Sequence, residues 1–173
     1  LYFSAWLEEE KEKTILPWRA ASNKIYDLPH EIFITTGYEW DQLDDDSKQE
    51  LLTRNFIIHP SSDRMGYQLK GEPLQLLSLI ELISSGVNFG TIQLLPNGQL
   101  VILMADHQTT GGYPRIAHVI AAHFPKLAQL RPSDAIKFTM TSMEHAEELY
   151  CAQQNELQIL QRACADHLKQ LVC

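Results

Sequence analysis

The sequence predicts a mainly β fold with accessory helices and one long helix at the C-terminus. Strand-like segments outnumber segments with helical periodicity, and their order is not the strand–helix alternation of a doubly wound parallel sheet. Asn97-Gly98 separates two apolar runs, the strongest short-range signal for a β-hairpin, and predicts a turn in which both residues have positive φ. These features favour a β-barrel or β-sandwich.

The strand candidates are short apolar runs bounded by turn residues. Gly37 ends the first run and Pro60 ends the second. The predicted strands cover residues 31–36, 55–59, 81–87, 91–95, 99–104 and 135–139.

Three helices are expected between and after these strands. Residues 41–54 carry Asp44, Asp45 and Asp46 near their start, which suit the positive end of a helix dipole. Residues 114–124 place apolar side chains at helical spacing behind a proline at the first position. A long helix starts near Ser142, where Thr141 and Glu144 form a T-x-x-E capping box.

The chain of 173 residues is long enough for one domain with a substantial core. We expect an N-terminal arm or linker over residues 1–27, a barrel domain over 28–141 and the C-terminal helix over 142–173.

Charge and cysteine content narrow the class of function. With 14 Lys+Arg against 22 Asp+Glu the net charge is −8, which disfavours a protein that reads a nucleic-acid backbone. The longest apolar runs fall far short of the roughly 20 residues that span a membrane. An odd count of 3 cysteines without a C-x-x-C pair favours reduced thiols and a cytoplasmic location.

Residues 61–71 form the first candidate site. Arg64 precedes a glycine, and a guanidinium fork there could hold a carboxylate over a cleft. The alternative is structural: Asp63 pairs with Arg64 or caps a turn.

The loop that follows the hairpin is the second candidate. Two glycines before a predicted helix let the backbone approach a ligand, and the free N–H groups of a helix start attract anions. Hydroxyl, amide and carboxylate groups beside them could orient a polar substrate, although a plain connection is equally compatible with the sequence. The loop residues are Asp106, Gln108, Thr109, Thr110, Gly111, Gly112 and Tyr113.

Several other chemistries lack their motifs. The sequence contains neither a Walker A loop nor the G-x-S-x-G of serine hydrolases. His118 and His123 are five residues apart on a predicted helix and cannot share a metal as an i,i+4 pair would, so no metal site is expected.

Three blocks resemble one known family. They are S-S-D-R-M-G-Y-Q-L-K-G at 61–71, the run at 84–120 that includes Q-T-T-G-G-Y-P-R-I-A, and A-Q-L-R-P-S-D-A-I-K-F at 128–138. The chain resembles the family of the C subunit of bacterial 5-oxoprolinase, also called KipI antagonist or allophanate hydrolase subunit 2. It is also similar to the carboxyltransferase part of biotin-dependent urea carboxylase.

The resemblance implies a cyclophilin-like β-barrel and a role in a complex. With the 5-oxoprolinase subunits B and A, the family opens 5-oxoproline to glutamate using ATP, which we expect another subunit to bind. Members are usually about twice as long, so the chain resembles a C-terminal half, and we expect it to be inactive alone. Under this interpretation Arg64 pairs with the substrate carboxylate, residues 109–112 offer N–H groups, and Gln93 and Gln108 bind the lactam.

Two alternatives stay open. The chain could be a non-catalytic antagonist that binds a KipI-like inhibitor of a histidine kinase. It could also be the carboxyltransferase half of a urea carboxylase, which needs a biotinyl carrier domain whose lysine motif this sequence lacks.

Overall fold

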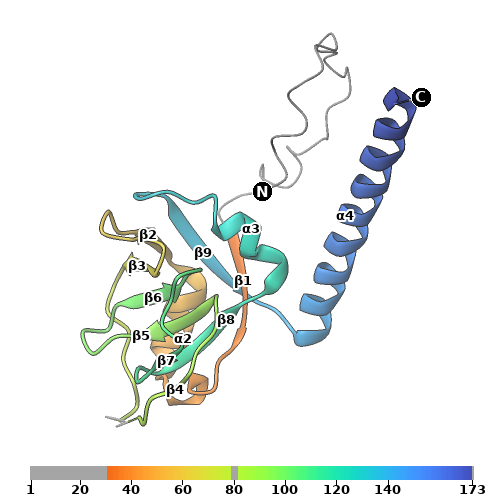
Figure 1. Ribbon diagram of the computed structural model, residues 1–173. Helices are drawn as coiled ribbons and strands as arrows, with labels where there is room; N and C mark the ends of the chain where they lie inside the picture. Colours follow the sequence, from red (N-terminus) through yellow and green to blue (C-terminus); the bar gives the residue numbers. More distant parts are fainter. Residues whose placement is uncertain (1–30, 79–81, 173) are drawn as a thin grey trace.

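A computed structural model describes residues 31–78 and 82–172, with side chains up to residue 166. Seven strands form a closed barrel in the order β1-β8-β5-β6-β3-β2-β9, and β1 closes it by pairing in parallel with β9 (Figure 1). The strands are β1 Glu31–Thr36, β2 Asn55–Ile58, β3 Gly66–Lys70, β5 Thr91–Leu94, β6 Leu100–Leu103, β8 Arg115–Val119 and β9 Ala135–Met140. The mainly β class with a long C-terminal helix is confirmed. The expected arm at 1–27 lies outside the described residues.

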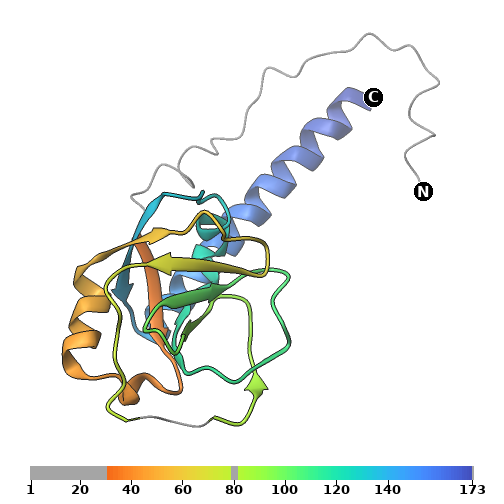
Figure 2. The same ribbon diagram turned by 90° about the vertical axis from the view of Figure 1, so that its left-hand side faces the viewer.

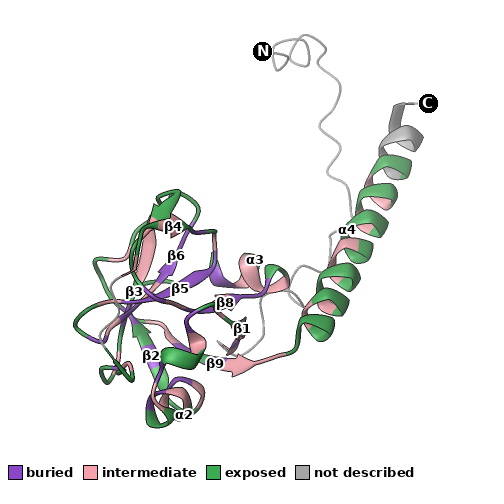
Figure 3. Ribbon diagram, turned by 90° about the horizontal axis from the view of Figure 1, so that it is seen from below, coloured by how far each residue is buried: buried purple, intermediate pink, exposed green. Residues whose placement is uncertain are grey.

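The buried residues that form the core lie mainly on the barrel strands, drawn in purple in Figure 3. Alternate residues of β1 and β9 point inward, so β1 contributes Ile32 and Ile34 while β9 contributes Ile136 and Phe138, all completely buried. Each such side chain stabilises the fold by about 1.5–3 kcal/mol. This packing fixes which residues the strands present on the outside.

The strand β5 differs because it is buried on both faces. Ile92 and Leu94 join the core, whereas Thr91 and Gln93 point outward and are still only 0% and 2% exposed. Gln93 is covered by a two-stranded ribbon, β4 Ser85–Gly86 paired with β7 Thr110–Gly111, which we call the ribbon.

The hairpin between β5 and β6 is confirmed, but its turn type was predicted wrongly. Only Gly98 takes a positive φ, of 79°, and Asn97 does not. The peptide N–H of Gly98 donates to the carbonyl of Leu95 (2.9 Å), and that of Leu95 donates to Gln99 (2.8 Å). Pro96 precedes Asn97 and its ring fixes φ near −65°, so the chain reverses with a single left-handed glycine.

The predicted helix over 114–124 is wrong. Residues 115–119 form β8, which pairs with β1 and β5, followed by the short helices η3 Ala121–His123 and α3 Phe124–Leu127. A bulge opposite the Ile92/Gln93 step leaves Ile116 and Ala117 both completely buried. Two adjacent buried residues imitate the spacing of an apolar helix face, which explains the error.

Two other boundaries shift. The helix predicted from residue 41 is a turn of 3₁₀ helix, η2 Trp40–Gln42, followed by α2 Asp45–Thr53. Asp44 caps α2 by accepting from the N–H of Ser47 (2.6 Å), and hydrogen bonding to the side chain and backbone of Ser47 lowers the pKa of Asp44. A strand was predicted over 81–87, and within the described part of that range only Ser85–Gly86 is a strand.

The last helix, α4 Met143–Val172, leaves the barrel and projects from it (Figures 1 and 2). Its cap is Ser142, whose Oγ accepts from the N–H of His145 (3.2 Å), rather than the predicted Thr141. The helix contacts η3 through Gln153, whose Nε2 donates to the carbonyl of Ala122 (2.9 Å), and β1 through the ring of His145, whose centre lies 6.3 Å from that of Phe33. Within the described part of the chain, no helix is apolar over the length that a bilayer crossing requires.

His123 should make stability depend on pH. The N–H of Phe33 donates to its Nδ1 (2.9 Å), so the ring must stay neutral, and burial, with the charge of Lys126, lowers the pKa of His123 from 6.5 to about 4. As pH falls, His123 therefore takes up a proton at a higher pH in the unfolded chain than in the folded chain. This lowers the free energy of unfolding between pH 6.5 and 4. We expect a loss of about 1–2 kcal/mol after allowing for partial exposure.

Urea unfolding at about pH 7.5 and about pH 4.5 measures this slope. Because burial also lowers the pKa of His118, His123→Gln should reduce the slope without abolishing it. An identical slope in the wild-type protein and in His123→Gln would contradict the assignment.

Candidate functional site

Arg64 and Asp106 meet at one end of the β3–β6 pair. Two backbone hydrogen bonds extend this pairing beyond the strands: Met104 N–H donates to Met65 (3.0 Å), and Asp106 N–H donates to Arg64 (2.9 Å). The side chains form a two-pronged ion pair, with Nε to Oδ2 at 3.1 Å and Nη2 to Oδ1 at 3.3 Å. The two candidate segments thus touch at this point.

Asp63 does not take part in that pair. Its Oδ1 accepts from the N–H groups of Met65 (2.9 Å) and Gly66 (3.3 Å), which is the turn-capping role considered for it. The guanidinium of Arg64 therefore pairs with Asp106 and not with Asp63.

The Arg64–Asp106 pair is exposed, at 84% and 48% of the two side chains. Ion pairs in such surroundings contribute only about 0–1 kcal/mol, because water and salt screen them. A second carboxylate could therefore replace that of Asp106 on Arg64 at little cost.

The rest of the second candidate loop leads from Asp106 into the ribbon. Its backbone pairs with the segment 85–87, including a bond from the N–H of Val87 to the carbonyl of Thr109 (3.1 Å). Gln108, Thr109, Thr110 and Tyr113 are exposed. No helix begins after Gly112, so the expected cluster of free N–H groups at a helix start is wrong.

Gln93 lies beneath the ribbon. Its Nε2 donates to the carbonyl of Tyr113 (3.4 Å), and a Cβ added to Gly111 would lie only 2.6 Å from that nitrogen. Gly111 thus leaves room for the amide of Gln93, which would have to shift to accommodate a larger residue there. At 2% exposure, Gln93 can reach a ligand only if the ribbon moves.

The structure adds two residues that the sequence analysis missed, Glu39 and Arg115. Glu39 accepts from the backbone N–H of Arg115 (2.8 Å), from its Nε (3.1 Å) and from its Nη2 (2.8 Å). Burial raises the pKa of Glu39, but these hydrogen bonds and the positive charge of Arg115 outweigh it and hold that pKa below its ordinary value. Arg115 stands in the quoted Y-P-R-I-A block, whereas no sequence signal connects Glu39 with a strand 76 residues away.

His118 completes the polar residues on the outside of the barrel. Its Nδ1 lies 3.2 Å from Oγ1 of Thr91, which also accepts from the N–H of Asn88 (3.2 Å). Burial, together with the charge of Arg115, lowers the pKa of His118, so its imidazole is neutral at pH 7. The outer faces of β5 and β8 therefore offer hydroxyl, amide, imidazole and guanidinium groups side by side.

Thr91 and Gln93 are buried here, and Arg115 is paired with Glu39. The groups open to a small polar molecule are therefore Arg64 and the exposed loop residues 108–110. In the part of the chain that is described, no group of three His, Cys, Asp or Glu side chains is placed to hold a metal ion. The site therefore consists of the exposed Arg64–Asp106 pair, the ribbon and the polar residues below it.

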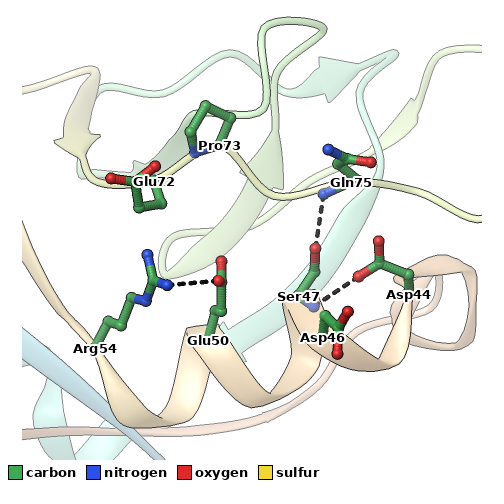
Figure 4. Close-up of a pocket in the computed structure, with 8 residues that line it drawn as sticks. All are labelled: Asp44, Asp46, Ser47, Glu50, Arg54, Glu72, Pro73 and Gln75. Atoms are coloured by element: carbon green, nitrogen blue, oxygen red, sulfur yellow. Dashed lines mark hydrogen bonds and ion pairs between the residues drawn. The ribbon is translucent and has the colours of Figure 1, made fainter.

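A separate open hollow of about 480 Å³ lies between α2 and the segment 72–75 (Figure 4). Four carboxylates and one arginine line it, and Arg54 pairs there with Glu50 at 2.7 Å. None of the predicted site residues borders it. The hollow is therefore distinct from the candidate site.

Comparison with known proteins gives one family and named relatives. Residues 5–140 match the family model described as carboxyltransferase domain, subdomain A and B. The chain is 47% identical over 94 residues to the C subunit of 5-oxoprolinase from Haemophilus influenzae, which is 54% of this chain and 30% of that protein. It is 39% identical over 124 residues to the C subunit of 5-oxoprolinase from Escherichia coli K12, which is 72% of this chain and 38% of that protein.

The chain thus spans about a third of the length of these curated relatives. Among solved structures, it superimposes on Kluyveromyces lactis urea carboxylase with a TM-score of 0.69 at 22% identity, covering 74% of this chain and 12% of that one. It also matches TTHA0988 with a TM-score of 0.54 at 26% identity, covering 73% and 23%. The first likeness shows the barrel fold.

The two adjacent glycines of the ribbon provide a matched test of the packing on Gln93. Gly111→Ala should cost about 1–3 kcal/mol, because its methyl group collides with the amide of Gln93. Gly112→Ala should cost less than about 0.5 kcal/mol, because its Cβ would lie 3.6 Å from Oγ of Ser84. Urea unfolding measures both, and equal losses would contradict the packing described.

Proposed function

The chain belongs to the carboxyltransferase subdomain A and B family, and we propose that it forms part of the substrate cleft of an ATP-dependent 5-oxoprolinase complex. The relatives named as the C subunit of 5-oxoprolinase, at 47% and 39% identity, support this activity. The word subunit in their names supports a role beside other chains, which we take to be subunits A and B. The reaction proposed is the opening of 5-oxoproline to glutamate.

The observation that carries the proposal is the exchangeable carboxylate on Arg64. The substrate is a small cyclic amide with a carboxylate, and Arg64 already holds a carboxylate in two-pronged geometry while being 84% exposed. We propose that the substrate carboxylate takes the place of Asp106 on this fork.

Arg115 is the less suitable cation for that role. Its side chain is 21% exposed and its partner Glu39 is 6% exposed. Breaking such a buried pair from one side costs about 3–5 kcal/mol, against about 0–1 kcal/mol for the exposed pair. The difference favours Arg64 as the group that binds the substrate anion.

The loop beside Arg64 would hold the lactam. Gln108, Thr109 and Thr110 are exposed there and bring an amide and two hydroxyls. Contact between the lactam and Gln93 requires the ribbon to move off that side chain. The backbone of residues 109–112 would then bind the ligand as ribbon rather than as the start of a helix.

The loop 106–113 offers little to hold the phosphates of ATP. It contains no lysine or arginine, and no helix begins directly after it to receive a phosphate. We therefore assign ATP to another subunit, where activation of the stable lactam carbonyl would occur. In this chain the proposed role is to bind and orient the substrate.

Asp106→Asn and Arg64→Met should change the KM for 5-oxoproline in opposite directions in the complex assembled with subunits A and B. Removing the competing carboxylate should lower KM about two- to fivefold, because the exposed pair contributes at most about 1 kcal/mol. Removing the cation should raise KM about tenfold or more, because a charge-assisted hydrogen bond is worth about 1.5–3 kcal/mol.

Glu50→Gln is the matched control, because it removes the carboxylate of the Arg54 pair on α2, away from the site. It should leave KM unchanged. Full 5-oxoproline-dependent ATP hydrolysis by Arg64→Met would remove Arg64 from the mechanism. Assembly without turnover in the wild-type complex would instead favour a purely binding role.

A further inference from the structure

We propose that Glu39 and Arg115 are positioning residues whose ion pair holds the ribbon over Gln93 and thereby controls access of a small polar ligand to that side chain. The identity of the ligand rests on the proposed function. The position of the ribbon does not, because it follows from contacts within this chain.

Arg115 ties together three segments that are distant in the sequence. It belongs to β8, its Nε and Nη2 donate to Glu39 just before η2, and its Nη1 donates to the carbonyl of Gly86 in β4 (3.4 Å). Gly86 pairs with Thr110 of β7. One guanidinium therefore attaches a strand of the ribbon to the wall of the barrel.

The other strand of the ribbon is held through the backbone next to Arg115. Tyr113 lies two residues before Arg115 in the chain, and its carbonyl accepts a hydrogen bond from Nε2 of Gln93 (3.4 Å). The N–H of Glu39 donates to the carbonyl of Arg115 (3.1 Å) while Oε2 of Glu39 accepts from its N–H (2.8 Å). The pair thus fixes the backbone at the point where β7 passes into β8.

The geometry favours positioning over ligand binding. Both oxygens of Glu39 accept from Arg115, and the guanidinium donates from Nε, Nη1 and Nη2. The side chain of Glu39 is only 6% exposed, and the ring of Tyr38 lies 5.3 Å from the guanidinium carbon. These groups are therefore committed to contacts within the chain.

Hydrogen exchange on the ribbon tests the proposal. The N–H of Val87, which donates to Thr109 across the ribbon, should exchange at least about tenfold faster in Arg115→Met and in Glu39→Gln than in the wild-type protein. Arg115→Lys keeps the charge but loses the planar fork, so its exchange should be intermediate. Glu50→Gln, which disturbs a different ion pair, should leave the ribbon unchanged.

Amides of β1 and β9 report whether a variant has loosened the whole barrel. Faster exchange confined to residues 85–87 and 109–113 supports the positioning role. Equal acceleration across β1 and β9, or an unchanged ribbon, overturns it. Glu39→Gln is nearly isosteric, so it keeps the test valid if Arg115→Met fails to fold.

Kinetics of the assembled complex separate this proposal from the proposed function. Loosening the ribbon should change the KM for 5-oxoproline by at least about fivefold while kcat stays within about twofold, and Arg115→Lys should partly restore KM. An unaltered KM with a loosened ribbon overturns the control of access. A wild-type complex without 5-oxoprolinase activity overturns the function, whereas the exchange result still decides the role of Glu39 and Arg115.

Discussion

The burial of β5 on both faces is the constraint on which the candidate site depends. A barrel strand normally shows one face to the core and one to water, yet Thr91 and Gln93 are almost fully buried on the outer face. Burying such polar groups is unfavourable unless they are hydrogen-bonded, and the contacts to His118 and to the carbonyl of Tyr113 satisfy this requirement. The ribbon must therefore lie close to the barrel, which explains a glycine at position 111.

Two arginines near the ribbon hold carboxylates under opposite conditions. Arg64 and Asp106 meet in water, where the pair is weak and can exchange partners. Arg115 and Glu39 meet largely out of water, where removing one partner leaves a buried charge. The first arrangement suits capture of an anionic ligand, and the second suits a fixed support. Two arginine–carboxylate pairs of the same chemistry thus suit different purposes because their exposure differs.

The sequence predicted the parts of this fold that local chemistry determines. Strand β1 ends at Thr36 as predicted because Gly37 follows it, and the β5–β6 hairpin agrees because Gly98 supplies the left-handed turn residue. The helix predicted over 114–124 failed because a bulge is set by pairing with β1 and β5, which no local spacing reveals. The ion pair between Arg64 and Asp106 joins two segments that the sequence had marked as separate candidates, whereas Glu39 and Arg115 are joined only by the closure of the barrel.

A structure of the assembled complex with 5-oxoproline bound would test the role of Arg64 most directly. We expect the ligand carboxylate on the fork of Arg64, the side chain of Asp106 turned away, and the Glu39–Arg115 pair intact. A ligand bound elsewhere while Arg64 and Asp106 remain paired would contradict that role.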